Sequence, residues 1–273
     1  MIRLIATDLD GTLLSGHETI SDENLRAIRK ALSNGIVFVA ASGRSADSCG
    51  RLLRRYEMDG PIIAVNGGHV VSRRNGDTLS LHPMSRALAA ECMRIFETHA
   101  LHACLYTTEW IVYSSLEALC YYEEFLTPEG KTKRRYAEGV RHGRDAIADA
   151  LNGTPLKAFC AFLPGQEAAF QAARDACAKL PGACLTSSWP DNFEVMPEGV
   201  NKAKALAELA ARLDILRDEV MAFGDSDNDI EMLQWAGIGV AMENAREEVK
   251  RAADYVTKAC YDDGVAHAMK LFL

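Results

Sequence analysis

No apolar run in this 273-residue chain approaches the roughly 20 residues that cross a membrane. We find no Cys-x-x-Cys pair, internal repeat or low-complexity tract either. The formal net charge is -8, so neither nucleic acid nor an anionic membrane is expected as the main partner. The composition is otherwise that of a globular protein, with 48% hydrophobic and 25% charged residues, so a sizeable core is expected.

The eight cysteines are scattered along the chain, mostly in apolar surroundings, as reduced core cysteines are. An even number could also indicate disulfides, but that interpretation suits much smaller secreted chains. We therefore expect reduced thiols and a cytoplasmic location. The cysteines are Cys49, Cys92, Cys104, Cys120, Cys160, Cys177, Cys184 and Cys260.

The first third of the chain alternates between buried strands and amphipathic helices. Three short apolar runs, residues 2–6, 36–41 and 61–65, are typical of buried strands. Ser21 is expected to cap the helix between the first two, and Asn75-Gly76 predicts a hairpin turn. Strands that alternate with helices indicate a parallel sheet with right-handed crossovers.

The middle of the chain has a different character, with irregular alternation and no catalytic motif. Beyond it, the strand and helix pattern resumes, with strands predicted at residues 193–196 and 220–223. We therefore predict a discontinuous α/β core, a doubly wound, Rossmann-like parallel sheet formed by residues 1–83 and 188–273. Residues 84–187 are predicted to form an inserted α/β domain.

The run D-L-D-G-T follows the first predicted strand and brings two carboxylates, Asp8 and Asp10, to its carboxyl end. Side chains alternate along a strand, so both are expected on one side, at the edge where open α/β sheets bind ligands. Two such carboxylates repel each other unless a cation lies nearby, and Mg2+ prefers oxygen ligands of this kind. For this run alone, a turn with two capping aspartates is an alternative.

Two further motifs could hold phosphate. Ser42 and Gly43 end the second predicted strand, where a hydroxyl and a free backbone N–H can bind phosphate oxygens. Lys202 opens a predicted helix, a position where the helix dipole disfavours a cation, which suggests a specific role. Ordinary turn chemistry at Ser42 and an exposed lysine are the alternatives.

An acidic loop follows the predicted strand at residues 220–223. Asp225 and Asp229 lie in this loop with Asn228 beside them, an arrangement that favours a metal site. A calcium loop of the EF-hand type is excluded because the preceding helix and the twelve-residue pattern with its terminal glutamate are missing.

In their order along the chain, the motifs D-L-D-G-T, A-S-G-R, G-V-N-K and G-D-S-D-N-D resemble those of phosphatases of the haloacid dehalogenase (HAD) superfamily. The resemblance is to the Cof type, subfamily IIB, and covers essentially the full length. Family members commonly have glycine after the motif lysine, whereas this chain has Ala203 there.

The resemblance implies a HAD-like core with a C2-type cap formed by the insert, and it implies roles for the motif residues. Asp8 would be the nucleophile and Asp10 the general acid and base. Mg2+ would be bound by Asp8, the backbone carbonyl of Asp10 and Asp225, with Asp229 behind them. The transferring phosphate would be held by the Leu9 backbone, Ser42, Gly43, Lys202 and Asn228.

The function expected from the resemblance is a Mg2+-dependent phosphatase of small phosphorylated metabolites, such as sugar phosphates or phosphorylated cofactors. Two alternatives remain open: a phosphomutase, and a catalytically reduced regulatory protein that binds phosphate esters. The substrate and the oligomeric state, monomer or dimer, are not predicted. Other candidates near the site or in the cap, each with packing or structure as an alternative, are Arg44, Asn66, Glu109, Trp110, Tyr113 and Tyr121.

Overall fold

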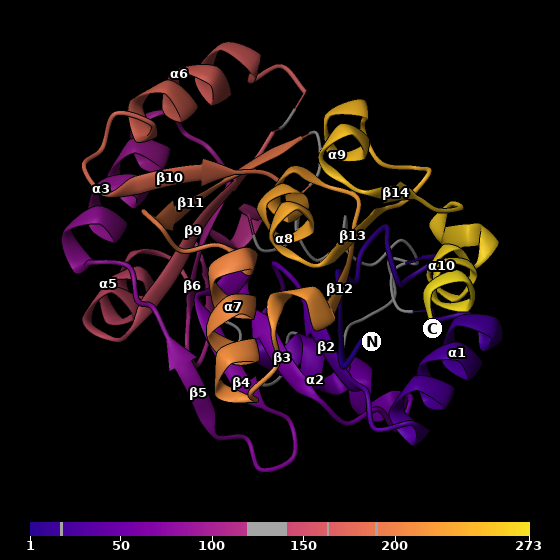
Figure 1. Cartoon of the computed structure of the whole chain (residues 1–273). Helices are drawn as coiled ribbons and strands as arrows, with labels where there is room; N and C mark the ends of the chain where they lie inside the picture. Colours follow the sequence, from indigo (N-terminus) through magenta and orange to yellow (C-terminus); the bar gives the residue numbers. More distant parts are fainter. Residues whose placement is uncertain (17–18, 119–140, 163, 189–190) are drawn as a thin grey trace. The chain divides into compact units, whose positions relative to one another are not determined.

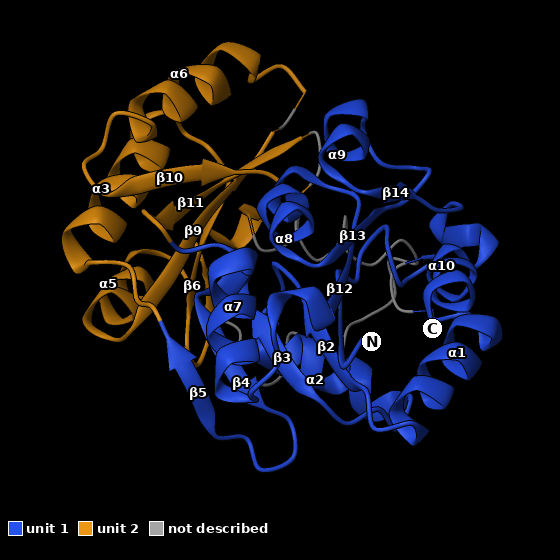
Figure 2. Cartoon of the chain, viewed as in Figure 1, with its two compact units in different colours: residues 1–81, 200–273 blue, residues 82–199 orange. Residues whose placement is uncertain are grey.

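The chain divides into two compact units, which we describe separately (Figures 1 and 2). Unit 1 consists of Met1–Leu81 and Val200–Leu273, and unit 2 of His82–Gly199. The computed structural model describes residues 1–16, 19–118, 141–162, 164–188 and 191–273. None of the helices in these ranges is both long and apolar enough to cross a membrane.

Unit 1 is built on an eight-stranded sheet whose order is β14-β13-β12-β1-β2-β3-β4-β5. The strands from β14 to β3 are parallel, while β4 and β5 add an antiparallel hairpin at one edge. In sheet order the strands are β14 (Tyr255–Val256), β13 (Ile238–Ala241), β12 (Val220–Gly224), β1 (Leu4–Thr7), β2 (Val37–Ala41), β3 (Pro61–Ala64), β4 (His69–Ser72) and β5 (Thr78–Leu81).

Helices cover both faces of this sheet, which confirms the doubly wound architecture. On one face Leu4 and Ala6 of β1 pack against Leu206, Met232 and Val249 from three helices. That face is covered by α7 (Lys202–Arg212), α8 (Ile230–Trp235) and α9 (Glu247–Ala252). The other face is covered by α1 (Asp22–Ser33), α2 (Ala46–Arg55) and α10 (Gly264–Phe272). Helices α1 and α10 lie side by side (Figure 1). Short 3-10 turns occur at η1 (Val65–Gly67), η3 (Arg217–Glu219), η4 (Asp227–Asp229) and η5 (Cys260–Asp262).

Local signals account for these elements. The Ser21 side chain accepts a hydrogen bond from the backbone N–H of Asn24 and so caps α1, as predicted. Gly35 follows the helix with a φ of +79°, a left-handed conformation that glycine adopts without strain. The predicted hairpin is also present, since Asn75 and Gly76 lie between β4 and β5.

Strand β1 lies at the centre of the parallel sheet, between β12 and β2. The register pairs Thr7 with Phe223 of β12 on one side and with Ala40 of β2 on the other. The chain leaves β1 towards β2 and later returns through β12, so β1 and β12 flank the point where the strand order reverses. The residues that follow these strands therefore meet at the edge where open α/β sheets bind ligands.

Unit 2 contains a six-stranded sheet of order β10-β11-β9-β6-β7-β8, in which only β7 and β8 pair in parallel. One face packs against helices through a core that includes Phe96, Phe170 and Phe193. The elements are α3 (Arg86–Thr98), β6 (Ala103–Thr107), β7 (Ile111–Tyr113), β8 (Arg141–His142), α5 (Arg144–Asn152), β9 (Pro155–Ala161), α6 (Glu167–Cys177), β10 (Ala183–Thr186) and β11 (Asn192–Pro197).

A buried ion pair joins two strands of this sheet. The Lys157 Nζ lies 3.1 Å from Glu194 Oε1, and each side chain is only 1% exposed. The ammonium group also lies 4.3 Å from the centre of the Tyr106 ring, within the range of a cation–π contact. Two charges so far from solvent must satisfy each other.

The prediction that residues 193–196 form a strand of the core sheet is wrong. They belong to β11, which pairs antiparallel with β9 and β10 in the sheet of unit 2. Phe193 and Val195 face the helix-covered core there. A short strand with one apolar face has the same sequence pattern in either sheet, so the pattern alone did not identify its partners.

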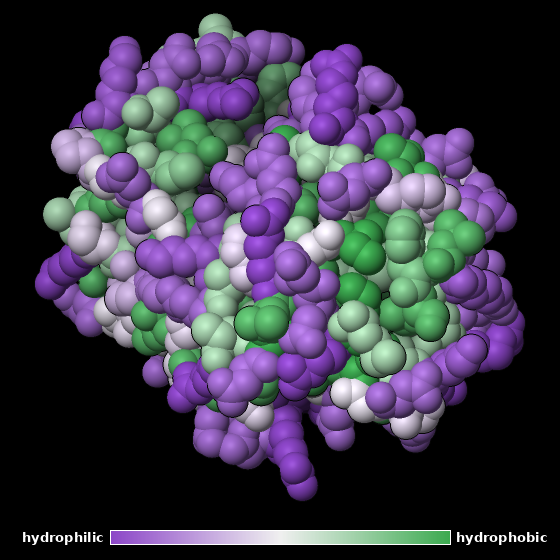
Figure 3. Space-filling view, in the orientation of Figure 1, coloured by the Kyte–Doolittle hydropathy of each residue, from purple (hydrophilic) through white to green (hydrophobic). Residues whose placement is uncertain are grey.

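The visible surface of the molecule is largely hydrophilic, in keeping with the charged composition (Figure 3). Apolar side chains are exposed on β14, on η5 and near the end of α10, and Figure 3 shows hydrophobic residues at the right of the view. Scattered apolar residues of this kind are normal on a protein surface. They are Val256, Tyr261, Leu271, Phe272 and Leu273.

Candidate active site

Asp8 directly follows β1 and is almost fully buried, with 5% of its surface exposed. Its backbone N–H donates to the carbonyl of Phe223 at 3.0 Å, which extends the pairing of β1 with β12 by one residue. Leu9 turns into the interior, with no exposed surface. Asp8 is therefore held rigidly by the sheet beside the end of β12.

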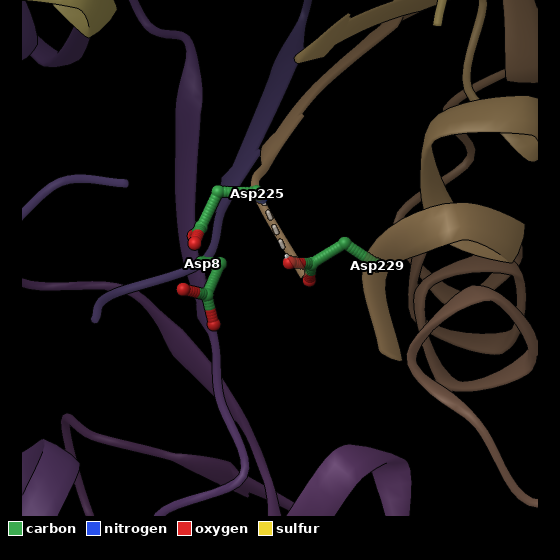
Figure 4. Close-up of side chains that lie close together, drawn as sticks. All are labelled: Asp8, Asp225 and Asp229. Carbon is green, nitrogen blue, oxygen red and sulfur yellow. Dashed lines mark hydrogen bonds between the residues drawn. The ribbon is translucent and has the colours of Figure 1, made fainter. Parts of the chain in front are cut away.

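Asp225 and Asp229 approach Asp8 from the loop after β12. One carboxylate oxygen from each of the three residues lies within 4.8 Å of the other two (Figure 4). Figure 4 shows the carboxylates of Asp8 and Asp225 close together and that of Asp229 directed towards them. Three oxygen donors from two loops are the ligand type that a hard divalent cation prefers.

Lys202 supplies a positive charge to this group of carboxylates. It is the first residue of α7, with Asn201 as the N-cap, so the predicted position at a helix start is confirmed. Its Nζ donates to Oδ1 of Asp8 at 2.6 Å and to Oδ1 of Asp229 at 2.7 Å, and its side chain has no exposed surface. Such a lysine is found in a protein interior only when it is paired.

Asp229 is fully engaged by the protein. While Oδ1 accepts from Lys202, Oδ2 accepts from the backbone N–H groups of Asp225 and Ser226, each at 3.1 Å. A side chain at Gly224 would not fit, because its Cβ would lie 2.4 Å from the Cβ of Asp229. Asp229 thus organises the loop and the lysine and has few lone pairs left for a metal.

Burial and charge shift the proton affinities of these groups. Burial raises the pKa of Asp8 well above its usual value, although Lys202 acts in the opposite direction. Burial and then the Asp229 carboxylate raise the pKa of Asp225 to about 7. Burial alone would lower the pKa of Lys202, but Asp229 and Asp8 outweigh it and raise that pKa above its usual value. The site therefore demands additional positive charge.

The turn after Asp8 supports Asp225, a role that we did not predict. The Thr12 hydroxyl donates to Oδ1 of Asp225 at 2.6 Å. Gly11 has a φ of +81°, and a Cβ there would lie 2.5 Å from Oδ2 of Asp225. The amide of Asn244 holds this turn by donating to the Gly11 carbonyl at 2.8 Å. Gly11 and Thr12 end the D-L-D-G-T run, so the motif contained this signal.

The predicted phosphate-binding residues Ser42 and Asn228 are both buried. Ser42 follows β2, and its hydroxyl accepts from the backbone N–H of Arg44, the residue after Gly43, at 3.2 Å. Asn228 donates through Nδ2 to Oδ1 of Asn66 at 3.0 Å, while its own Oδ1 is buried without a hydrogen-bond partner. The O and N atoms of an amide can exchange places, so one polar end of Asn228 remains available to a ligand.

The side chain of Asp10 is not part of the carboxylate group. It is half-exposed and forms an ion pair with Arg44. The prediction that Asp8 and Asp10 share one side of a strand is wrong, because β1 ends at Thr7 and Asp10 lies beyond it, in an isolated bridge with Leu14. Each of the two aspartates has a cation of its own, Lys202 for Asp8 and Arg44 for Asp10.

Comparison with known proteins identifies the family. The family model described as haloacid dehalogenase-like hydrolase matches residues 5–269. The chain belongs to the haloacid dehalogenase-like hydrolases. The expectation of a Cof-type member of the HAD superfamily is thereby confirmed.

Individual HAD-like relatives agree with this assignment. The Bacillus subtilis protein named 5-amino-6-(5-phospho-D-ribitylamino)uracil phosphatase YcsE is 32% identical over 269 residues, which cover 98% of this chain and 95% of the relative. A HAD-like hydrolase from Bacteroides thetaiotaomicron is 30% identical with a TM-score of 0.82, and each chain is covered completely. A B. subtilis HAD-like hydrolase is 27% identical, with a TM-score of 0.87 and the same coverage.

Ala203, the departure from the HAD-like motif, is accommodated without disturbance. It is 8% exposed and packs in the core beneath α7. Among the candidates in unit 2, Tyr113 is buried in a small apolar cluster, while Trp110 is 39% exposed and lies under the guanidinium of Arg141. Tyr121 lies outside the described residues.

Proposed function

We propose that this protein is a Mg2+-dependent phosphatase of small phosphorylated metabolites that forms an aspartyl-phosphate on Asp8. The observation that carries the proposal is the buried contact of Asp8 with Lys202, beside Asp225 and Asp229 at the carboxyl edge of the sheet. A carboxylate that a fixed cation orients can attack phosphorus, and the resulting intermediate divides the hydrolysis into two displacements.

We assign the proton transfers to Asp10. It lies two residues from the nucleophile and is accessible to solvent. In the first displacement it would donate a proton to the leaving oxygen, and in the second it would accept a proton from the attacking water. Asp8 cannot accept the proton of the attacking water, because its oxygen is bonded to phosphorus during the second step.

The residues present fit Mg2+. Asp8 and Asp225, with the backbone carbonyl of Asp10, would bind it directly. Asp229 would lie behind them, because both of its oxygens already accept hydrogen bonds. When bound, Mg2+ supplies positive charge that neutralises the carboxylates and the phosphate oxygens. Thr12 then has the role of orienting Asp225 through its 2.6 Å hydrogen bond.

We assign the binding of the phosphate oxygens to groups around Asp8. Phosphoryl transfer depends on positioning and charge neutralisation more than on covalent chemistry. Lys202 contributes charge, while Ser42 after β2 and Asn228 in η4 contribute polar groups. The unpartnered end of the Asn228 amide supports this assignment. The backbone N–H groups of Leu9 and Gly43 complete the proposed set.

We assign substrate selection to the inserted residues, predicted at 84–187 and contained within unit 2. The relative named for 5-amino-6-(5-phospho-D-ribitylamino)uracil makes this phosphorylated ribityl compound a candidate, beside sugar phosphates and phosphorylated cofactors. We also propose a cytoplasmic location, which the thiol state of the buried residues Cys49, Cys104 and Cys160 supports.

The test is phosphate release from a panel of these compounds with Mg2+ or with EDTA. We expect release that requires Mg2+ and that ranks the panel. Retention of the phosphoryl group on a second hydroxyl of the product would instead favour a phosphomutase. Tight ester binding by metal-loaded protein without turnover would favour a regulatory binding protein.

A further inference from the structure

Arg44 holds the carboxylate of Asp10 with two parallel hydrogen bonds. Its Nε donates to Oδ2 at 2.7 Å and its Nη2 donates to Oδ1 at 2.5 Å. Both carboxylate oxygens are thus engaged by one guanidinium. This arrangement fixes the plane as well as the place of the carboxylate, which a single hydrogen bond or an ammonium group does not do.

The backbone of Arg44 is also held by hydrogen bonds. The Arg44 N–H donates to the Ser42 hydroxyl at 3.2 Å, and the Arg44 carbonyl accepts from the N–H of Val65 at 2.9 Å. Ser45, the next residue, is the N-cap of α2. The arginine is therefore attached to the ends of β2, β3 and α2, while Asp10 lies in the turn after β1.

Asp10 needs this support. Its side chain is 51% exposed, whereas that of Arg44 is only 19% exposed. An exposed aspartate outside regular structure has several side-chain conformations available to it. A group that transfers a proton must instead lie within hydrogen-bond reach of one particular oxygen. In this structure, the ion pair with Arg44 restricts the conformations open to the Asp10 side chain.

We propose that Arg44 is a positioning residue that orients Asp10 for proton transfer. The inference rests on the proposed function, in which Asp10 is the general acid and base. As the Asp8 oxygen bonds to phosphorus and the bond from phosphorus to the leaving oxygen breaks, the proton moves from Asp10 to that oxygen. Asp10 is then left as the carboxylate that Arg44 holds here with two hydrogen bonds.

Leaving groups of different basicity test this role. An alkyl phosphate requires a proton on its leaving oxygen, whereas p-nitrophenolate departs without one. Arg44→Gln is expected to lower kcat/KM for an alkyl phosphate by about 10-fold to 100-fold, with most of the change in kcat. For p-nitrophenyl phosphate we expect less than about a 3-fold change. Arg44→Lys, which keeps charge without the two-pronged geometry, should lie between Arg44→Gln and the wild type.

A matched control separates positioning from general effects of removing an arginine. Arg51 lies on α2 and pairs with the exposed Asp47 in the same helix. Arg51→Gln should therefore leave kcat/KM unchanged for both substrates. Circular dichroism and thermal unfolding of each variant show whether it is folded.

A double-mutant cycle with Asp10→Asn decides whether Arg44 acts through Asp10. Asp10→Asn alone should lower kcat/KM for the alkyl phosphate by about 100-fold or more and affect p-nitrophenyl phosphate much less. Adding Arg44→Gln to Asp10→Asn should then cost less than about 2-fold further.

Two results would overturn the inference while the proposed function stands. One is an equal loss on both substrates with a raised KM, which would mean that Arg44 binds the phosphate. The other is a multiplicative loss in the double variant. If Asp10→Asn showed no dependence on the leaving group, the proposed role of Asp10 would fail, and that of Arg44 with it.

Discussion

At the scale of single residues, Lys202 is the centre of the site's electrostatics. Its ammonium group bonds to both Asp8 and Asp229 and has no contact with solvent. It therefore both orients the proposed nucleophile and offsets the charge of the loop after β12. A fixed, desolvated charge acts far more strongly than the same charge in water.

Lys202→Met should lower kcat by about 100-fold or more, because a preorganised charge beside the transferring phosphoryl group is lost. Lys204→Met is the matched control, since Lys204 lies one half-turn further along α7 and is exposed. It should keep the wild-type kcat. Thermal unfolding measured beside the rates shows whether Lys202→Met remains folded. More than a tenth of the wild-type rate in Lys202→Met would contradict the assignment.

We predict that His69, the first residue of β4, makes the free energy of unfolding depend on pH. Burial lowers the pKa of its imidazole below the ordinary 6.5, so the unfolded chain takes up this proton at a higher pH than the folded protein. The contribution of His69 to stability is therefore complete above pH 6.5 and is lost as the pH falls below that value. Urea unfolding at pH 7.5 and 5.5 should show a larger loss for the wild type than for His69→Gln. An equal loss would contradict this role.

At the scale of elements, the turn that joins β1 to the rest of the site depends on a glycine for two reasons. Gly11 has a positive φ, and it also lies against the Asp225 carboxylate. Gly35, after α1, has nearly the same φ, +79°, but a Cβ there would meet nothing within 4 Å. The two glycines thus separate backbone strain from steric contact.

Alanine at each glycine gives a matched pair. Both Gly11→Ala and Gly35→Ala should lower the free energy of unfolding by about 1 kcal/mol from the left-handed backbone alone. Gly11→Ala should in addition raise the Mg2+ concentration needed for half-maximal activity, because its methyl group displaces Asp225. Magnesium titrations of phosphate release measure this. A shift as large in Gly35→Ala would refute the steric explanation.

The sheet of unit 2 depends on its internal ion pair. Lys157→Met would leave Glu194 buried without its cation, and we expect a loss of about 3–5 kcal/mol in unfolding free energy. Glu194→Gln added to Lys157→Met should restore at least half of that loss, because no uncompensated charge remains. Arg94→Met, which breaks an exposed pair with Glu91, should leave the unfolding free energy close to that of the wild type. Denaturant unfolding of the wild type and the three variants tests these values.

At the scale of the whole molecule, the sequence predicted the elements that meet at the site. Asp8 and Lys202 are 194 positions apart in the chain. Asp8 follows a strand and Lys202 begins a helix, and the hydrophobic pattern of the sequence predicts both elements. The sequence placed the motifs at Asp8, Ser42 and Asp225 each just after a predicted strand, and parallel strands end at one edge of a sheet. The register of β1 with β2 and β12 shows that these three strands are neighbours.

The features that were not predicted depend on tertiary contacts with little local signal. The pairing of β11 with β9 instead of with the core sheet is one case. The ion pair of Asp10 with Arg44 and the amide contact of Asn66 with Asn228 are others. An arginine or an asparagine in a loop has many possible partners, and only the folded chain selects one.

The most direct test of the account is covalent labelling during turnover. The protein is mixed with Mg2+ and a 32P-labelled phosphate ester that it hydrolyses, quenched in acid and analysed for label on the protein. The account predicts label that hydroxylamine releases, with both label and turnover absent in Asp8→Asn and retained in Asp77→Asn, a change in the exposed hairpin. Undiminished turnover by Asp8→Asn would contradict it.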